Sequence, residues 1–180
     1  MGTLNQLQEN ISKPAEKMKV SLSYHDQELY AFLSKACTDI GQIDEDGWTP
    51  MHRAIEINNI EIMKWLIFKS LGADLNFTNF CGSTPLTFAI LKGNLDIIEL
   101  LVKSGADINF EDKLRWIPLT RAIEAENIDI VRFLCQKGAD LNMKVSTGWT
   151  PIVKAVSKDN MEIIRLLIDK SADVNLSDKN

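Results

Sequence analysis

The sequence is poor in the residues that carry most enzyme chemistry, since its 180 residues include two histidines and three cysteines. The cysteines are Cys37, Cys81 and Cys135, an odd number spread far apart, which favours a reducing compartment over a disulfide framework. No HExxH, CxxC or GxSxG pattern and no glycine-rich phosphate loop occurs. These absences predict a protein with no catalytic residues, no cofactor and no metal site.

Long hydrophobic runs and an excess of basic charge are also missing. No stretch of about 18 apolar residues occurs, so the sequence predicts no membrane span. Residues 1–20 are mostly polar and unlike a signal peptide, and we therefore expect a cytoplasmic protein. The net charge of −5 repels phosphate backbones, which argues against nucleic acid as a partner. The apolar share of 45% is large enough for a folded core.

What the sequence does contain is an internal repeat. Proline recurs at positions 50, 85, 118 and 151, with spacings of 35, 33 and 33 residues. Similar letters surround each copy, as in TPMHRA, TPLTFA, IPLTRA and TPIVKA. An asparagine follows nine residues after each proline, and an apolar stretch such as LDIIELLV comes next. Each copy closes with a short Ala-Asp signature such as GADIN at 105–109.

The recurring letters suit the ends of short helices. Threonine before proline caps unpaired N–H groups, and proline fits the first helical position. The repeated asparagine predicts the N-cap of a second helix, and an acidic residue two positions later is favoured by the helix dipole. Gly72, Gly105 and Gly138 predict left-handed helix ends. Each copy is thus expected to form a turn followed by two helices.

These features resemble the ankyrin repeat, a turn plus two antiparallel helices, and the resemblance covers about residues 44–176. It implies an all-α solenoid of stacked helix pairs with β-turn or hairpin fingers. We expect repeats at 44–78, 79–111, 112–144 and 145–180, the last with a C-terminal tail. A degenerate N-terminal capping half-repeat is expected at 23–43, after a flexible arm at 1–22.

Three copies depart from the pattern. Repeat 1 has two additional residues, which predicts a longer second helix or loop. In repeat 3, Arg115 replaces the turn glycine and Ile117 the capping threonine, through ordinary drift or because a fingertip is reshaped for a partner. Repeat 4 has Ser171 in place of glycine and no polar capping repeat after it. Its exposed apolar residues are expected to be Val156, Ile164 and Leu167. A frayed end, a continuation and a covering partner remain alternatives.

The resemblance implies a partner-binding surface made by the concave groove and the finger tips. The candidate residues are Glu45, Asp46, Trp48, Glu56, Phe80, Cys81, Leu91, Lys92, Lys113, Leu114, Trp116 and Trp149. The set is acidic in repeat 1, apolar in the middle and neutral to basic in repeat 4. We expect a partner across repeats 1–3 with a basic part facing repeat 1.

Several candidates also have a purely structural explanation. The three tryptophans can brace the turn beside each first helix, whereas Phe80 and Leu114 have less structural reason to be apolar and are expected to touch the partner. The acidic residues of repeat 1 form a solvated rim, and Cys81 is a plain exposed thiol. His52 is expected to hydrogen-bond within the turns.

The sequence therefore predicts a non-catalytic module that binds another protein. One version is an inhibitor, such as an immunity protein or antitoxin for a neighbouring enzyme. Another is an adaptor or a secreted effector that engages host proteins. An enzyme is the alternative of a different class, and it would need a ligand set that the sequence does not offer. A monomer is expected, with self-association through the uncapped C-terminal end as a further alternative.

Overall fold

A computed structural model describes residues 43–70 and 74–176, which all belong to one compact unit, Ile40–Asn180. The expected arm at 1–22 and all but the last residue of the half-repeat at 23–43 lie outside these ranges, as do Cys37 and Gly72. Within the described ranges the chain forms eight helices and no strand, which confirms the all-α prediction. None of these helices is long and apolar enough to cross a membrane.

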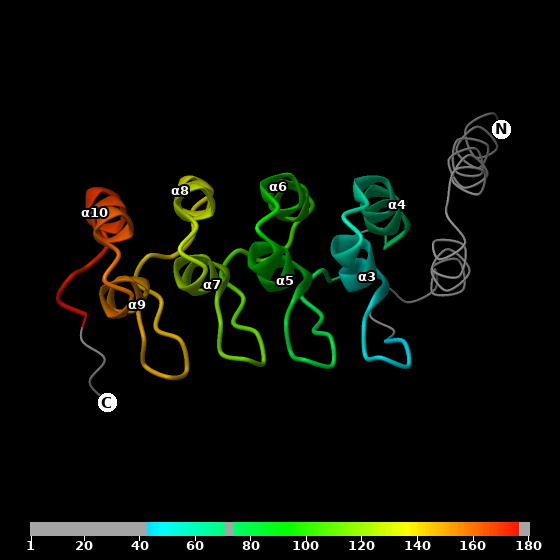
Figure 1. Cartoon of the computed structure of the whole chain (residues 1–180), viewed down its shortest axis with the longest axis horizontal. Helices are drawn as coiled ribbons and strands as arrows, with labels where there is room; N and C mark the ends of the chain where they lie inside the picture. Colours follow the sequence, from blue (N-terminus) through cyan, green and yellow to red (C-terminus); the bar gives the residue numbers. More distant parts are fainter. Residues whose placement is uncertain (1–42, 71–73, 177–180) are drawn as a thin grey trace. The chain divides into compact units, whose positions relative to one another are not determined.

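The helices form four pairs, one in each repeat. The first helices are α3 (Pro50–Glu56), α5 (Pro85–Lys92), α7 (Pro118–Glu124) and α9 (Pro151–Ser157). The second helices are α4 (Ile60–Ser70), α6 (Leu95–Lys103), α8 (Ile128–Gln136) and α10 (Met161–Asp169). The first helices contact one another in a row from α3 to α9, and each packs against its own second helix (Figure 1). The loops before the first helices project away from the row of second helices (Figure 1).

The predicted helix caps are present. In repeats 1, 2 and 4 the threonine before proline accepts a hydrogen bond from a backbone N–H in the first turn, as Thr84 does from Thr87 at 3.1 Å. The four asparagines cap the second helices, with Oδ1 to N–H distances of 3.0 to 3.2 Å. Each cap satisfies an N–H group that the helix leaves unpaired, so the sequence sets where each helix begins.

Four tight turns form the fingers, at 44–48 (finger 1), 79–83 (finger 2), 112–116 (finger 3) and 145–149 (finger 4). In each, the backbone N–H of the first residue donates to the carbonyl of the fifth, at 2.8 to 3.0 Å. The fourth residue has positive φ, and in finger 3 this residue is Arg115 at +67°. Finger 3 therefore keeps the shape of the glycine-containing fingers. The positive φ costs conformational free energy in arginine, which has a Cβ atom, but not in glycine.

The other departures also have structural outcomes. Helix α4 spans 11 residues against nine in α6, so the additional residues of repeat 1 lengthen the second helix. The side chain of Ile117 makes no cap hydrogen bond, but the hydroxyl of Thr120 accepts the backbone N–H of Ile117 at 3.2 Å. Ser171 adopts φ +68° and so takes over the left-handed position of the missing glycine.

Neighbouring repeats are joined by a recurring hydrogen bond. The side-chain oxygen of Asn76 accepts the backbone N–H of Asp107 in the next repeat. Asn109 accepts the N–H of Asp140 and Asn142 that of Asp173 in the same way, and the three N···O distances are 2.8 to 2.9 Å. This bond and the apolar contacts between first helices fix the spacing of the fingers, and hence the geometry of the surface they carry.

The C-terminal end of the described unit is partly as expected. Val156 is 60% exposed, whereas Ile55, Ile90 and Ile123 at the same position of repeats 1–3 are at most 2% exposed because the next repeat covers them. Ile164 is half-buried. The expectation for Leu167 is wrong, since this side chain is fully buried. Helix α10 contacts α9 of its own repeat and α8 of the preceding repeat, so Leu167 is buried without a further repeat beside it.

Candidate functional site

The finger tips and the first helices share one face of the unit, which we call the finger face. The second and third residues of every finger are exposed, and their character changes along the row. Finger 1 presents two carboxylates, finger 2 an aromatic ring and a thiol, finger 3 an ammonium and an apolar chain, and finger 4 two hydroxyls. The eight residues are Glu45, Asp46, Phe80, Cys81, Lys113, Leu114, Ser146 and Thr147.

Three large apolar side chains of repeats 2 and 3, Phe80, Leu91 and Leu114, are exposed on the finger face, and together we call them the apolar strip. Phe80 is 81% exposed, Leu91 56% and Leu114 46%. The backbone of Phe80 is fixed, because its N–H donates to the carbonyl of Gly47 in finger 1 at 2.7 Å. Large apolar side chains held in water by a rigid backbone cost free energy that a partner can recover by burying them.

The acidic residues of repeat 1 are not isolated carboxylates. Asp46 forms an ion pair with Arg53, and Glu56 on α3 lies 2.7 Å from the ammonium of Lys92 on α5. Both pairs are solvated, so the expected acidic rim is partly neutralised but remains accessible. Such pairs contribute little to stability, about 0 to 1 kcal/mol each, and can be exchanged for partner contacts.

All three candidate tryptophans are half-buried, and each has a cation over its indole ring. Arg53 lies 5.5 Å from the Trp48 ring, Arg121 4.6 Å from Trp116, and Lys154 5.2 Å from Trp149. Lys154 also lies 4.9 Å from Trp116 and so links repeats 3 and 4. The tryptophans thus brace the first helices and also form part of the accessible surface.

The cations in this arrangement were missed by the sequence-based site. Arg53, Phe88, Arg121 and Lys154 occupy the same position, three residues after each proline. A signal for them exists in the aligned repeats. A cation occurs at this position in the three repeats that have tryptophan five residues earlier, and phenylalanine occurs in the repeat that has serine there. Phe88 fits the exception, because its ring packs edge-on against Trp48 of the preceding repeat at 5.1 Å.

His52 has a structural position, as expected. Its side chain is fully buried, and its Nε2 donates to the carbonyl of Ser83 at 3.0 Å while Nδ1 accepts from the hydroxyl of Thr49 at 2.6 Å. Burial lowers the pKa of His52 to about 4, so the ring is neutral at pH 7. Cys81 is exposed, whereas burial raises the pKa of the half-buried Cys135. Among residues 43–70 and 74–176, no three or more His, Cys, Asp or Glu side chains gather into a group suited to a metal ion.

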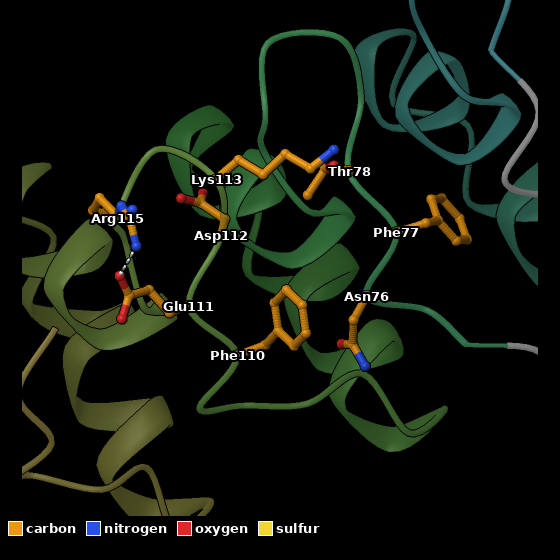
Figure 2. Close-up of a pocket in the computed structure, with 8 residues that line it drawn as sticks. All are labelled: Asn76, Phe77, Thr78, Phe110, Glu111, Asp112, Lys113 and Arg115. Atoms are coloured by element: carbon orange, nitrogen blue, oxygen red, sulfur yellow. Dashed lines mark ion pairs between the residues drawn. The ribbon is translucent and has the colours of Figure 1, made fainter. Parts of the chain in front are cut away.

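Two recesses lie beside the fingers. The larger, of about 660 Å³, lies between the segment before finger 2 and finger 3. In Figure 2 the Lys113 side chain extends toward Thr78, and Glu111 and Arg115 face each other at the opposite end. Of the candidate residues only Lys113 lines it. The smaller recess, of about 220 Å³, lies on the finger face and brings together the candidates Leu114, Trp116 and Trp149 with Lys154.

Comparisons with known proteins agree with this architecture. The family model for ankyrin repeats (3 copies) matches residues 18–112 and 105–178. A probable 26S proteasome regulatory subunit p28 of Saccharomyces cerevisiae is 31% identical over 87 residues, covering 47% of this chain and 38% of that protein. The I-Kappa-B like protein C2 of Microplitis demolitor bracovirus is 39% identical over 73 residues, 40% of each chain. The human protein phosphatase 1 regulatory subunit 27 is 45% identical over 58 residues, 32% of this chain and 36% of that protein.

The matched segments thus span about 40% of the length of these curated relatives. Among solved structures, the ankyrin repeat domain of Bcl-3 is similar with a TM-score of 0.72 and 25% identity, covering 82% of this chain and 69% of that one. The matched family regions cover most of the chain, and the repeated turn and helix pair occurs where the sequence predicts it. The chain belongs to the ankyrin-repeat family.

Proposed function

We propose that the protein is a non-catalytic module that binds a partner protein on its finger face. The observation that carries the proposal is the apolar strip of Phe80, Leu91 and Leu114, exposed by 81%, 56% and 46% on neighbouring repeats. A partner that buries these side chains gains free energy from apolar contact. Where the backbone is already held in place, as at Phe80, binding loses little conformational entropy.

The partner lies across repeats 1–3 in this proposal, with a basic part facing Glu45 and Asp46. Both carboxylates are exposed on finger 1, ahead of the apolar strip. Complementary charge at this end sets the direction in which the partner lies and raises the rate of association. The similarity to proteins named as regulatory subunits and to an I-Kappa-B like protein supports a role in controlling the bound partner.

The test compares the proteins that the full chain captures from native cell extract with those captured by a double variant, Phe80→Asp plus Leu114→Asp. Both side chains are exposed, so the variant is expected to fold, as circular dichroism and urea unfolding will show. A matched control carries Phe68→Asp plus Met161→Asp, two apolar residues on second helices that are 50% and 54% exposed.

Quantitative mass spectrometry is expected to show proteins retained by the wild type and the control and depleted with the double variant. Equal retention by all three forms would contradict binding on the finger face. The absence of any protein specific to the wild type would contradict the binding function itself.

A further inference from the structure

The smaller recess of the finger face combines apolar walls with a cation at its base. It lies between fingers 3 and 4 and helix α9, and its volume is about 220 Å³, enough for one or two side chains of a partner. Its lining includes the apolar side chains of Leu114, Trp116, Val145 and Trp149 and the cations Arg115 and Lys154, and no Asp or Glu of the described residues lines it.

Lys154 is held in place by its neighbours. Its ammonium lies over the rings of both Trp116 and Trp149, at 4.9 and 5.2 Å, and its side chain is only 17% exposed. The carboxylate of Glu124 pairs with it, and this hydrogen bond lowers the pKa of Glu124. Glu124 also lies 3.5 Å from Lys158, which in turn lies 3.6 Å from Glu126.

Two further cations lie near Lys154. Arg115 lines the recess, and its guanidinium donates to the hydroxyl of Ser146 at 2.8 Å and lies 3.6 Å from Glu111. Arg121 lies 4.6 Å from the Trp116 ring, and its Nε is buried without a hydrogen-bond partner within the described part of the chain. Burial lowers the pKa of Arg121 even though the carboxylates of Asp112 and Glu124 lie near it. Asp112 is already occupied, because it accepts hydrogen bonds from Leu114, Trp116 and Thr87. For Arg121, desolvation therefore outweighs the attraction of the nearby carboxylates.

From this arrangement we infer that the recess receives an acidic residue of the partner together with an adjacent apolar side chain. The partner's carboxylate faces Lys154 and Arg115, the two cations that line the recess, and the apolar side chain lies on Leu114 and Val145. The inference rests on the proposed function and extends the partner's contacts from repeats 1–3 to finger 4 and α9 of repeat 4. A basic or phosphate-rich segment fits less well, because Lys154 repels the first and the acidic finger 1 with the net charge of −5 disfavours the second.

The inference is tested with a random dodecapeptide library displayed on phage and selected on the immobilised full chain. Selection on the wild type is expected to enrich peptides in which Asp or Glu adjoins a large apolar residue. Selection on the variant Lys154→Gln is expected to lose this enrichment. A matched control, Lys103→Gln, removes a lysine that is 63% exposed and paired with Glu99 on α6, and it is expected to behave like the wild type.

Individual enriched peptides then give affinities by fluorescence anisotropy. We expect about tenfold weaker binding to Lys154→Gln, and a similar loss when the peptide's Glu is replaced by Gln, as for the removal of one charged contact in a partly desolvated site. The peptide substitution keeps the test valid if Lys154→Gln proves unstable in urea.

Two results overturn the inference in different ways. Peptides without any acidic preference, whose binding is abolished by Phe80→Asp plus Leu114→Asp, would refute the acidic contact and leave the finger face as the binding surface. A library that yields no enriched peptide on the wild type would count against both the inference and the proposed function.

Discussion

The Nε2 of His52 lies 3.0 Å from the carbonyl oxygen of Ser83, which is 31 residues further along the chain. This bond joins helix α3 to finger 2 and therefore couples the folding of two repeats. The bond to Ser83 forms in either protonation state, whereas Nδ1 can accept the hydroxyl of Thr49 only in the neutral ring. The contact between repeats thus holds finger 2, which carries Phe80, and burial keeps the ring neutral at pH 7.

Acid is expected to destabilise the protein through His52. The pKa of His52 is about 4 in the folded chain and about 6.5 when unfolded, so the unfolded chain binds more protons between these values. The contribution is complete above pH 6.5 and is lost as the pH falls toward 4. Between pH 7.5 and 5 the free energy of unfolding should fall by about 2 kcal/mol more in the wild type than in His52→Gln, measured by urea unfolding. Equal pH dependence of the two proteins would show that His52 titrates normally.

A methyl group at Gly47 is expected to disturb two fingers. Gly47 has φ +78°, and a Cβ there would lie 2.2 Å from the Cβ of Phe80. Gly47→Ala should therefore lower the free energy of unfolding by about 2 to 5 kcal/mol, through left-handed strain and overpacking together. Gly138→Ala is the control, because φ is +87° and nothing lies within 4 Å of the new methyl group, which leaves about 1 to 2 kcal/mol of strain alone. Equal losses in thermal or urea unfolding would refute the close contact with finger 2.

The same repeat position should tolerate truncation only in repeat 4. Ile123 is fully buried between repeats, so Ile123→Ala is expected to cost about 2 to 5 kcal/mol in urea unfolding. Val156 is 60% exposed, and Val156→Ala should cost about 0.5 kcal/mol or less. A cost above about 2 kcal/mol for Val156→Ala would mean that another surface covers this end in solution.

The hydrogen bonds between repeats should be worth a measurable amount. The Asn109 side chain accepts the N–H of Asp140 at 2.8 Å in a partly exposed turn. Asn109→Ala is expected to lower the free energy of unfolding by about 0.5 to 1.5 kcal/mol, the usual net value of one hydrogen bond. Asn109→Asp keeps an acceptor oxygen for the N–H of Asp140 and serves as the control, and a loss as large in this variant would show that this hydrogen bond is not the source of the effect.

The helix pairs were predictable because their signals are local. Threonine, proline and asparagine act on N–H groups within three residues, so Thr84 and Asn94 place their helix ends whatever the rest of the chain does. The contact of Lys154 with Trp116 was not predictable in this way, because the two residues are 38 positions apart and meet only after the repeats stack. Leu167 was misjudged for a related reason, since the sequence does not say which side of α10 its own repeat covers.

The candidate site also contains residues that the local sequence predicts and residues that only packing brings together. Phe80 and Leu114 stand out in the sequence because finger tips offer no core to an apolar side chain, and both are exposed in the structure. The contacts of the cations with the tryptophan rings arise from packing between neighbouring elements, so the sequence-based candidates did not include these cations. That these tip residues bind a partner remains a prediction.

Photocrosslinking measures the location of the partner most directly. A benzophenone-bearing residue is introduced at Leu91, which is 56% exposed on the finger face, and in a second protein at Met161, which is 54% exposed on α10. Irradiation of each complex with the captured partner is expected to give a covalent adduct from position 91 and little from position 161. An adduct from position 161 with none from position 91 would contradict binding on the finger face.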